Sequence, residues 1–393
     1  MLKNSFWEEI NKIINDKVLL IVLFGLPIFI TLLIGRVLSQ EVLLNVPIAV
    51  IDLDNSELSR QIINYFNQNQ TFSVDYFPEN EKEMEKLIRN SKARAGLIIP
   101  QDFYKDVMLA KSPEILMVYD GSHMSMTSAT KSSATEILLT LRSGAAIKQM
   151  MARLNLSYQE AYQIAQAISL SNRMLYNPQK SFEDFLAPVL FAGGVQSALV
   201  LTASASVEQD IYFEDKKKRK GYAGGKTLAY TLAGTFSMMA CILTQIIAFN
   251  TSFRGNIFLA GLLSVGLSFG VSAFCVFISS LLDNKSITMV IAALVFIPNS
   301  IMVGTTWPFY AMPKAYQMLC KLLPLEKFAV NLRDIYLKNI GIEQVIKDIA
   351  YMIIFGIIAV LLAEYTISIT EQRILTKEED DVSANSEAGA SIY

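Results

Sequence analysis

The chain has 393 residues, of which 52% are hydrophobic and only 18% are charged, and its formal net charge is −2 at pH 7. Soluble proteins average about 25% charged residues, so this composition indicates a membrane protein. The slightly acidic balance argues against a nucleic-acid partner, which requires a basic surface. A single histidine, and three cysteines without metal or disulfide spacing, argue against a histidine-based hydrolase and a multi-histidine metal site. We therefore expect no catalytic residue, metal or cofactor on this chain.

The first predicted elements are an amphipathic helix and a membrane span. Residues 1–17 carry apolar side chains at helical spacing, with Trp7 as an interfacial anchor. Residues 18–38 are an apolar run long enough to cross about 30 Å of hydrocarbon. A cleaved signal peptide is the alternative, but acidic residues precede the run and no small-residue cleavage site follows it. The lysines before the run place the N-terminus in the cytoplasm.

Residues 39–184 have the composition of a water-exposed α/β domain with long connecting helices. Strands are predicted at residues 47–53, 71–76, 93–99 and 114–119, and helices at residues 56–66, 79–91, 120–151 and 157–169. Strands that alternate with helices predict a sheet with some parallel pairing. We expect this domain to lie outside the cytoplasm, between the first two membrane spans.

Two aspartates, Asp52 and Asp54, follow the first predicted strand and allow two interpretations. They could hold a metal ion, or they could cap the helix that begins near Ser56. Short side-chain acceptors satisfy the free backbone amides at a helix start, and we favour this capping interpretation.

Five further apolar segments are long enough to span a bilayer. They are residues 185–206, 228–248, 257–282, 286–304 and 344–369. The loop between the first two of them, residues 207–227, holds the strongest charge cluster of the chain, which places this loop in the cytoplasm. The polar and acidic residues 370–393 are expected to form a disordered cytoplasmic tail.

One carboxylate, Glu364, lies near the inner end of the last span. An ionisable residue within a span is a functional candidate, because a charge in hydrocarbon is costly. At this depth the side chain can also reach the interface, so a pathway role and an interfacial role both stay open.

Four prolines interrupt the apolar sequence from residue 286 to residue 338. A proline removes a backbone donor and clashes with the preceding turn, so these residues cannot form one straight helix. Broken backbone at membrane depth persists only where protein or a wet cavity satisfies its polar groups. We predict an external re-entrant region at residues 305–343 that forms one wall of a gate or pathway. Its candidate gate residues are Pro298, Gly304, Pro308, Met312, Pro313 and Pro324.

This proline-rich pattern resembles the C-terminal signature of ABC-type-2 exporter permeases, with Pro298, Gly304, Pro308, Met312-Pro313, Leu323-Pro324-Leu325 and Leu332-Arg333 in order. Earlier in the chain, Asn15-Asp16-Lys17 and Tyr176-Asn177-Pro178 also resemble segments of this family. Three further segments, Val50 to Ser56, Ile99 to Phe103 and Tyr119-Asp120-Gly121, resemble signatures of the subgroup that has a large extracytoplasmic domain between its first two spans. The resemblance covers nearly the whole chain.

In that family, the loop that corresponds to residues 207–227 carries the coupling helix, which docks into a groove of the ATPase subunit. The resemblance therefore implies that the ATPase-coupling residues are Glu208, Gln209, Asp210, Glu214, Asp215 and Lys226. The usual Gly-Thr-x-Glu core of the coupling helix is absent here. The segment Gly225-Lys226-Thr227 resembles the end of a phosphate-binding loop, but Lys220 stands where that motif requires its first glycine.

The resemblance implies a permease subunit of an ATP-driven exporter in the bacterial cytoplasmic membrane, with both termini in the cytoplasm. ATP and Mg would bind a separate ATPase subunit, and a second permease copy would complete a homodimer or heterodimer. A periplasmic adaptor is a further partner on family analogy. The expected substrate is amphipathic or lipid-like, or a drug. The alternative is an envelope scaffold or mechanotransmitter, driven by an ATPase, that regulates an extracytoplasmic partner without transport.

Overall fold

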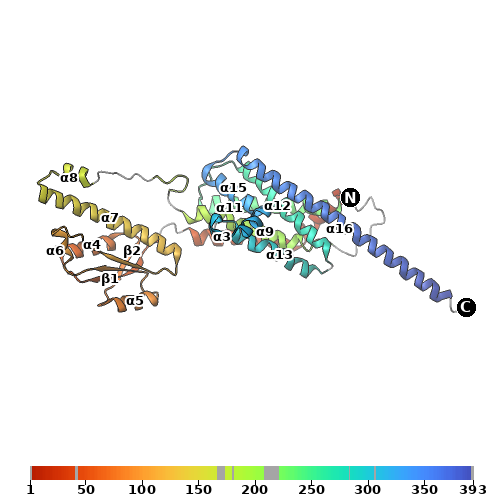
Figure 1. The fold of residues 1–393 in the computed structure, drawn as a ribbon. Helices are drawn as coiled ribbons and strands as arrows, with labels where there is room; N and C mark the ends of the chain where they lie inside the picture. Colours follow the sequence, from red (N-terminus) through yellow and green to blue (C-terminus); the bar gives the residue numbers. More distant parts are fainter. Residues whose placement is uncertain are drawn as a thin grey trace. The chain divides into compact units, whose positions relative to one another are not determined.

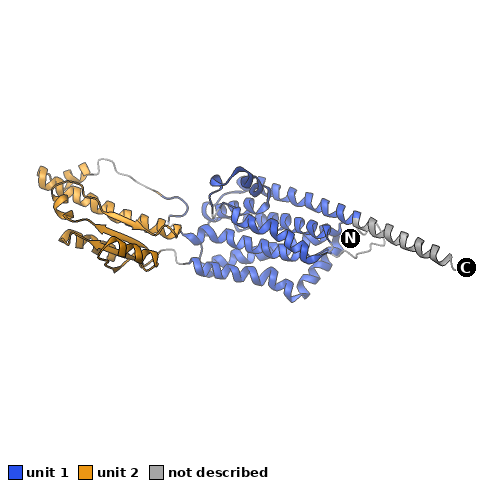
Figure 2. Cartoon of the chain, turned by 60° about the horizontal axis from the view of Figure 1, so that its bottom comes forward, with its two compact units in different colours: residues 1–41, 174–393 blue, residues 42–173 orange. Residues whose placement is uncertain are grey.

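The computed structural model describes residues 2–39, 43–165, 173–178, 181–207, 221–282, 284–304 and 307–390, with side chains described up to residue 369. Figure 1 shows the fold. The chain divides into two compact units: residues 1–41 with 174–393, which we call the membrane unit, and residues 42–173, which we call the α/β unit (Figure 2).

The membrane unit contains, among the described residues, six helices that are long and apolar enough to cross a membrane. They are Lys17–Leu38, Phe182–Ala203, Tyr222–Phe249, Ile257–Leu281, Lys285–Met302 and Ile342–Ile369. The first comprises α2 (Lys17–Leu20), a π-helical turn (Ile21–Gly25) and α3 (Leu26–Leu38); the next four are α9, α11, α12 and α13. The sixth is the apolar part of α16 (Ile342–Ala390). The predicted class, a helical membrane protein with six spans and an inserted α/β domain, is confirmed.

The first span begins with a side-chain cap and contains a wide turn. Asp16 Oδ1 accepts hydrogen bonds from the backbone amides of Val18 (2.8 Å) and Leu19 (3.3 Å). The π-helical turn lies directly before Pro27. Proline has no amide to donate to the residue four positions earlier, and a wider turn accommodates that loss.

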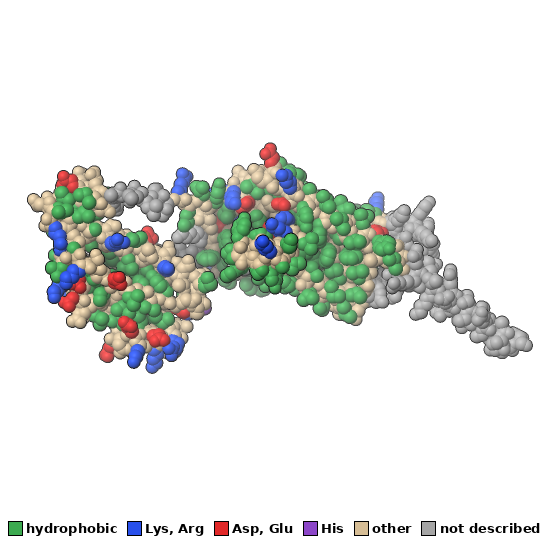
Figure 3. Space-filling view, in the orientation of Figure 1, with side chains coloured by type: hydrophobic (Ala, Val, Ile, Leu, Met, Phe, Trp, Pro, Cys, Tyr) green, Lys and Arg blue, Asp and Glu red, His purple; other side chains and the backbone are tan. Residues whose placement is uncertain are grey.

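Two helices, α9 and α12, form the centre of the membrane unit. In each, 67% of the residues in an apolar stretch of 18 residues are buried, compared with 22–39% in the other four spans. Gly234 of α11 allows close packing here, because a Cβ atom at this position would lie 2.8 Å from Leu199 of α9 and 2.9 Å from Ser268 of α12. Small residues at helix contacts let the backbones approach, which replaces the hydrophobic driving force that is missing in lipid. Figure 3 shows hydrophobic side chains over much of the visible face of these spans.

The last helix extends beyond the predicted C-terminal end of its span, residue 369. The backbone of α16 is helical to Ala390, where a disordered tail was predicted for residues 370–393. The first part of this segment is rich in Glu, Lys, Arg and Leu, which have high helix propensity and allow a helix to continue. The side chains from residue 370 onward lie outside the described residues.

The α/β unit contains a four-stranded sheet with the order β2-β1-β3-β4 within the described residues. The strands are β1 (Val46–Asp52), β2 (Phe72–Tyr76), β3 (Ala95–Ile99) and β4 (Leu116–Tyr119). Strand β1 pairs in parallel with both β2 and β3, and β4 pairs antiparallel with β3. The central strands β1 and β3 are the most buried, as expected for strands covered on both faces.

Helices cover both faces of this sheet. One core contains side chains of β1 and β3 together with α4 (Glu57–Gln68), α6 (Phe103–Met108) and α7 (Met124–Leu154). The opposite core contains Met84 of α5 (Glu81–Arg89). A further short helix, α8, comprises Tyr158–Ala165. The predicted strands and helices are therefore present, with small shifts at their ends.

Asp52 and Asp54 both accept hydrogen bonds at the ends of elements. Asp52 accepts bonds from the backbone amides of Asp54 (3.1 Å) and Asn55 (3.0 Å), and from Ser59 Oγ (2.6 Å). Asp54 accepts a bond from the amide of Tyr104, 3.1 Å away, in the first turn of α6. The cap of α4 itself is Ser56. Both carboxylates thus order turns and helix starts, and no cluster of metal-ligating residues occurs among the described residues.

A third aspartate, Asp120, fixes the end of β4. Asp120 Oδ1 accepts hydrogen bonds from the hydroxyl (2.6 Å) and the amide (3.0 Å) of Ser122, and Oδ2 accepts one from Arg94 (2.9 Å). These bonds, first those from Ser122 and then that from Arg94, hold the pKa of the Asp120 carboxyl at about 2, below its ordinary value of 3.8.

Candidate functional site

Helix α1 (Leu2–Asn15) packs directly on the start of α11 (Tyr222–Phe249). A Cβ atom at Gly225 would lie 2.6 Å from the carbonyl oxygen of Leu2 and 2.7 Å from Ser5 Cβ. Gly221, which precedes α11, has φ +90°, a value that L-residues with a side chain rarely adopt. Glycine at these two positions therefore allows the two helix backbones to touch.

A buried charge cluster joins the same two helices. Glu9 of α1 and Lys226 of α11 are 2% and 5% exposed, and the Lys226 ammonium nitrogen lies 2.6 Å from Glu9 Oε2. Tyr230, one helical turn after Lys226, donates its hydroxyl to Glu9 Oε1 at 2.8 Å. Lys226 also donates to the carbonyl of Ser206 at 2.7 Å. We call these three side chains and the Ser206 carbonyl the Glu9 cluster.

The Glu9 cluster satisfies each charge that it buries. A buried ion pair is stable only when further hydrogen bonds satisfy the remaining donors and acceptors. Here one carboxylate oxygen accepts from an ammonium ion and the other from a hydroxyl, while the ammonium ion also reaches a carbonyl. The arrangement fixes α1, the end of α9 and the start of α11 at one point.

The loop between α9 and α11 begins and ends at fixed positions. At its start, the amide of Val207 donates to Ser279 Oγ of α12 at 3.0 Å, one residue after the carbonyl that Lys226 holds. At its end, Gly221 contacts Leu2 of α1. The predicted coupling residues Glu208, Gln209, Asp210, Glu214 and Asp215 lie outside the described residues. Their placement stays a prediction.

Lys226, the remaining coupling candidate, is described, and its ammonium ion lies inside the Glu9 cluster. A buried ammonium ion that contacts Glu9 cannot also contact a protein docked on the surface. Its position therefore supports a role in connecting α1 to α11.

Glu364 of α16 also reaches the start of α11. Its Oε1 accepts hydrogen bonds from the backbone amides of Ala223 (2.9 Å) and Gly224 (3.3 Å). The first amides of a helix have no partner within the helix, and its N-terminus carries partial positive charge. A carboxylate is favourable in this position. Glu364 thus caps the start of α11 through its side chain, and its role in a substrate pathway stays a prediction.

The proline-rich region forms the end of one span, α13, followed by three short elements. Pro298 lies inside α13 (Lys285–Met302), which continues for one further turn before Gly304 adopts φ +89°. A single proline removes one donor and costs about 3 kcal/mol in a helix, which apolar packing can offset. The helix therefore ends at the glycine. Next to the proline, Gln196 of α9 donates to the carbonyl of Phe296 at 3.0 Å.

The other candidate gate residues lie at the starts of the short elements. Pro308 precedes the 3₁₀ turn Phe309–Ala311, and Met312-Pro313 precedes α14 (Lys314–Leu322). Pro324 is the first residue of α15 (Pro324–Lys338). Proline is favoured at a first helical position, because its fixed φ suits the helix and its missing amide is not needed there. The structure thus confirms short helices in this region, and a gate role is untested.

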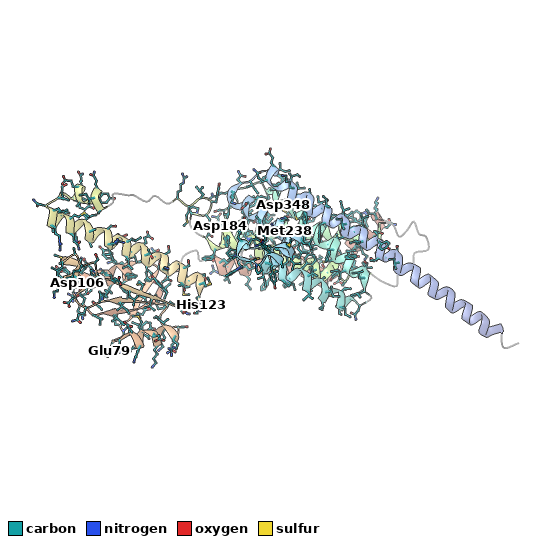
Figure 4. All side chains as sticks on the ribbon, viewed as in Figure 1. Glu79, Asp106, His123, Asp184, Met238 and Asp348 are labelled. Atoms are coloured by element: carbon teal, nitrogen blue, oxygen red, sulfur yellow. The ribbon has the colours of Figure 1, made fainter. Side chains whose placement is uncertain are left out.

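Polar contacts attach α15 to α16. Asn331 donates to Asp348 at 2.7 Å, and the Lys327 ammonium ion lies 3.0 Å from Glu326 and 4.0 Å from Asp348 (Figure 4). Tyr351 of α16 donates to the carbonyl of Leu322 at 2.9 Å. These contacts hold α15 and the end of α14 against the last span.

Sequence reasoning missed Glu9 as a site residue. The sequence does contain a signal: Glu9 lies between Phe6, Ile10 and Ile13 on the apolar side of the amphipathic helix. A carboxylate on an apolar helix face requires a buried partner. Such a partner could then be sought among the cations near the membrane interface.

Comparisons with known proteins agree with this architecture. Residues 17–365 match a family described as ABC-2 family transporter protein. The chain is 21% identical over 327 residues to the probable multidrug ABC transporter permease YbhR of Escherichia coli, which covers 81% of this chain and 85% of YbhR. It is 22% identical over 361 residues to the inner membrane transport permease YhhJ of Escherichia coli, with 86% and 89% covered.

A further relative, from a eukaryote, matches a shorter part of the chain. The chain is 24% identical over 203 residues to ABC transporter G family member 20 of Dictyostelium discoideum. The match covers 50% of this chain and 28% of that protein, so the chain spans less than a third of this relative. No solved structure matches the chain significantly.

Proposed function

We propose that this chain, which belongs to the ABC-2 transporter family and is a multi-pass membrane permease subunit, exports an amphipathic or lipid-like molecule or a drug. The energy would come from a separate ATPase subunit that binds ATP and Mg, because permeases of this family lack the ATPase domain. A second permease copy would complete the transporter.

The observation that carries this proposal is the Glu9 cluster. An ATPase subunit that closes on ATP must deliver its movement to the spans through cytoplasmic segments. The loop of residues 207–227 and helix α1 are the two candidate segments. The bonds of Lys226 to Glu9 and to the Ser206 carbonyl support the proposal, because they join α1 to the start of α11 and to the segment that follows α9, so that a push on α1 would move these segments together.

The nature of the substrate is inferred from two observations. A relative at 21% identity is named a probable multidrug permease, and the described spans carry few ionised side chains. Both observations favour an amphipathic molecule over an ion. The orientation, with both termini in the cytoplasm of a bacterial cell, rests on the lysines before the first span and the cations of the 207–227 loop.

The experiment starts from the tagged chain, purified in mild detergent. We expect a protein with ATP-binding motifs to co-purify with it. Changing Glu208 and Asp210 together to alanine should leave the basal ATPase rate of this complex intact and remove its stimulation by transported substrate. Lys3→Met, at an exposed position of α1, is the control.

Two outcomes would contradict the proposal. If no ATPase co-purifies and only an envelope enzyme or structural protein is recovered, the scaffold alternative replaces transport. If an ATPase is recovered but the double variant remains fully stimulated, the assignment of the coupling loop is wrong.

A further inference from the structure

The α/β unit contains a large groove that the transport function does not explain. Its volume is about 1210 Å³, above the roughly 300–1,000 Å³ typical of small-molecule sites. Its walls come from α4, from α7, and from α6 with the segment that leads to β4 (Figure 1). All lining residues belong to this one unit.

The groove lies along a part of α7 that has attachments near both of its ends. Between them, Leu138 and Leu141 pack against the core that α4 also contacts. At one point, Ser133 of α7 bonds Thr71 at 3.3 Å, beside the fully buried Ala134. At the other, Arg153 donates to the carbonyl of Met108 at the end of α6, at 2.7 Å. The cavity is lined by α7 residues 136–149 between these attachments.

Small residues keep the middle of the groove open. Gly144, Ala145 and Ala146 of α7 line it consecutively. A Cβ atom at Gly144 would meet no atom within 4 Å. Glycine weakens the interior of a helix, so a glycine that faces empty space has no packing reason to be there. Space for another molecule is a reason that fits.

The chemistry of the walls is amphipathic. The apolar lining includes Leu58 and Ile62 of α4 and Ile137, Leu138 and Leu141 of α7. The charged lining residues are two acids and two bases, namely Glu114, Glu136, Arg142 and Lys148. This balance matches a head group that carries both signs of charge, and it disfavours a strongly anionic or cationic one.

The length of the groove fits one lipid chain. The eleven α7 residues that line it lie between residues 136 and 149, a stretch that corresponds to about 20 Å of helix. One lipid chain covers half of a bilayer core of about 30 Å, or roughly 15 Å. The membrane unit keeps the protein at a bilayer, whose lipids carry chains of this length.

We propose that this groove binds a single-chain zwitterionic amphiphile, with the hydrocarbon chain against α4 and α7 and the head group at the charged residues. This site is independent of ATPase coupling: it would exist whether the chain transports or acts as a scaffold. A helix of a partner protein is the other occupant that such a groove could take.

The test uses the full-length chain in nanodiscs that contain a trace of a phosphocholine with one acyl chain and a photoactivatable group near the chain end. After irradiation, peptide mapping should find label on α4 and on residues 136–149 of α7. Gly144→Phe fills the groove and should reduce this label by about tenfold. Gly144→Ala is the matched control and should retain the label. Label on the spans reports lipid contact and should be equal in all three proteins.

Three results would overturn the inference. The first is label confined to the spans of the wild-type chain, a result that requires no variant to fold. The second is equal groove label in Gly144→Phe and Gly144→Ala when both give the wild-type span label. The third is cross-linking of the groove to a co-purified protein that unlabelled phosphocholine does not displace.

Discussion

Replacing Lys226 by methionine tests the buried charge cluster that joins α1 to α11. Methionine is also unbranched and of similar length, but it carries no charge. The change leaves Glu9 inside the protein with one remaining donor, the Tyr230 hydroxyl at 2.8 Å, and it removes the donor that the Ser206 carbonyl accepts from at 2.7 Å.

The size of the effect follows from the burial of both partners. Glu9 and Lys226 are 2% and 5% exposed, so water cannot replace the lost ammonium ion. Removing one partner of a buried ion pair costs about 3–5 kcal/mol. Because Tyr230 remains bonded to Glu9, we expect about 3–4 kcal/mol, in the lower part of that range. Adding Glu9→Leu should recover most of this loss, since replacing both partners by apolar residues is often nearly neutral.

The assay is reversible unfolding by SDS in mixed micelles, applied to the wild type, both single variants and the double variant. We expect each single variant to lose several kcal/mol and the double variant to lose far less than their sum, so that the double-mutant cycle shows a favourable coupling energy between Glu9 and Lys226. Lys3→Met removes an exposed lysine of the same helix and should change stability by less than about 0.5 kcal/mol.

Two results would refute this reasoning. If Lys226→Met is no more destabilising than Lys3→Met, the ammonium ion is hydrated rather than buried. If the double variant loses the sum of both single losses, the two side chains do not interact.

Three further predictions follow from contacts elsewhere. Gly225→Ala should displace α1, because its Cβ atom would lie 2.6 Å from a backbone oxygen, and limited proteolysis should then cleave α1 faster than in Gly224→Ala, whose nearest contact is 3.5 Å. Glu364→Gln should destabilise the membrane unit by about 1 kcal/mol in the same SDS assay, since the charge at the α11 N-terminus is lost. Because the pKa of Asp120 is lower in the folded protein, its ionised carboxylate stabilises the α/β unit fully above pH 3.8, and this stabilisation should disappear as the pH falls toward 2. Faster hydrogen exchange of β3 and β4 at low pH should report this loss, and Asp120→Asn should remove this part of the pH dependence.

The spans and strands could be predicted because their signals are local. Twenty apolar residues in a row, or a short apolar run between turn residues, identify an element without knowledge of its neighbours. The errors lie at element ends. Helix α9 begins at Phe182 rather than at residue 185, and Ser181 forms its cap. The first turn contains the acidic residues Glu183 and Asp184, so the apolar pattern that predicts a span begins only after them.

The Glu9 cluster could not be predicted in the same way, because Glu9 and Lys226 are 217 positions apart in the sequence. The sequence shows a carboxylate on an apolar helix face and a lysine at the start of a span. Only the packing of α1 on α11, which the glycines permit, brings them together. The groove of the α/β unit is equally non-local, since it depends on where α7 is attached.

The measurement that tests the central claim most directly is transport in reconstituted vesicles that contain the chain and its co-purified ATPase. The vesicles receive a fluorescent amphiphile, and its movement across the bilayer is followed with ATP or a non-hydrolysable analogue. Our account predicts movement that requires ATP hydrolysis and that falls in the Glu208 and Asp210 double alanine variant. ATP hydrolysis at the normal rate without movement of any amphiphile tested would contradict it and would support the mechanotransmitter alternative.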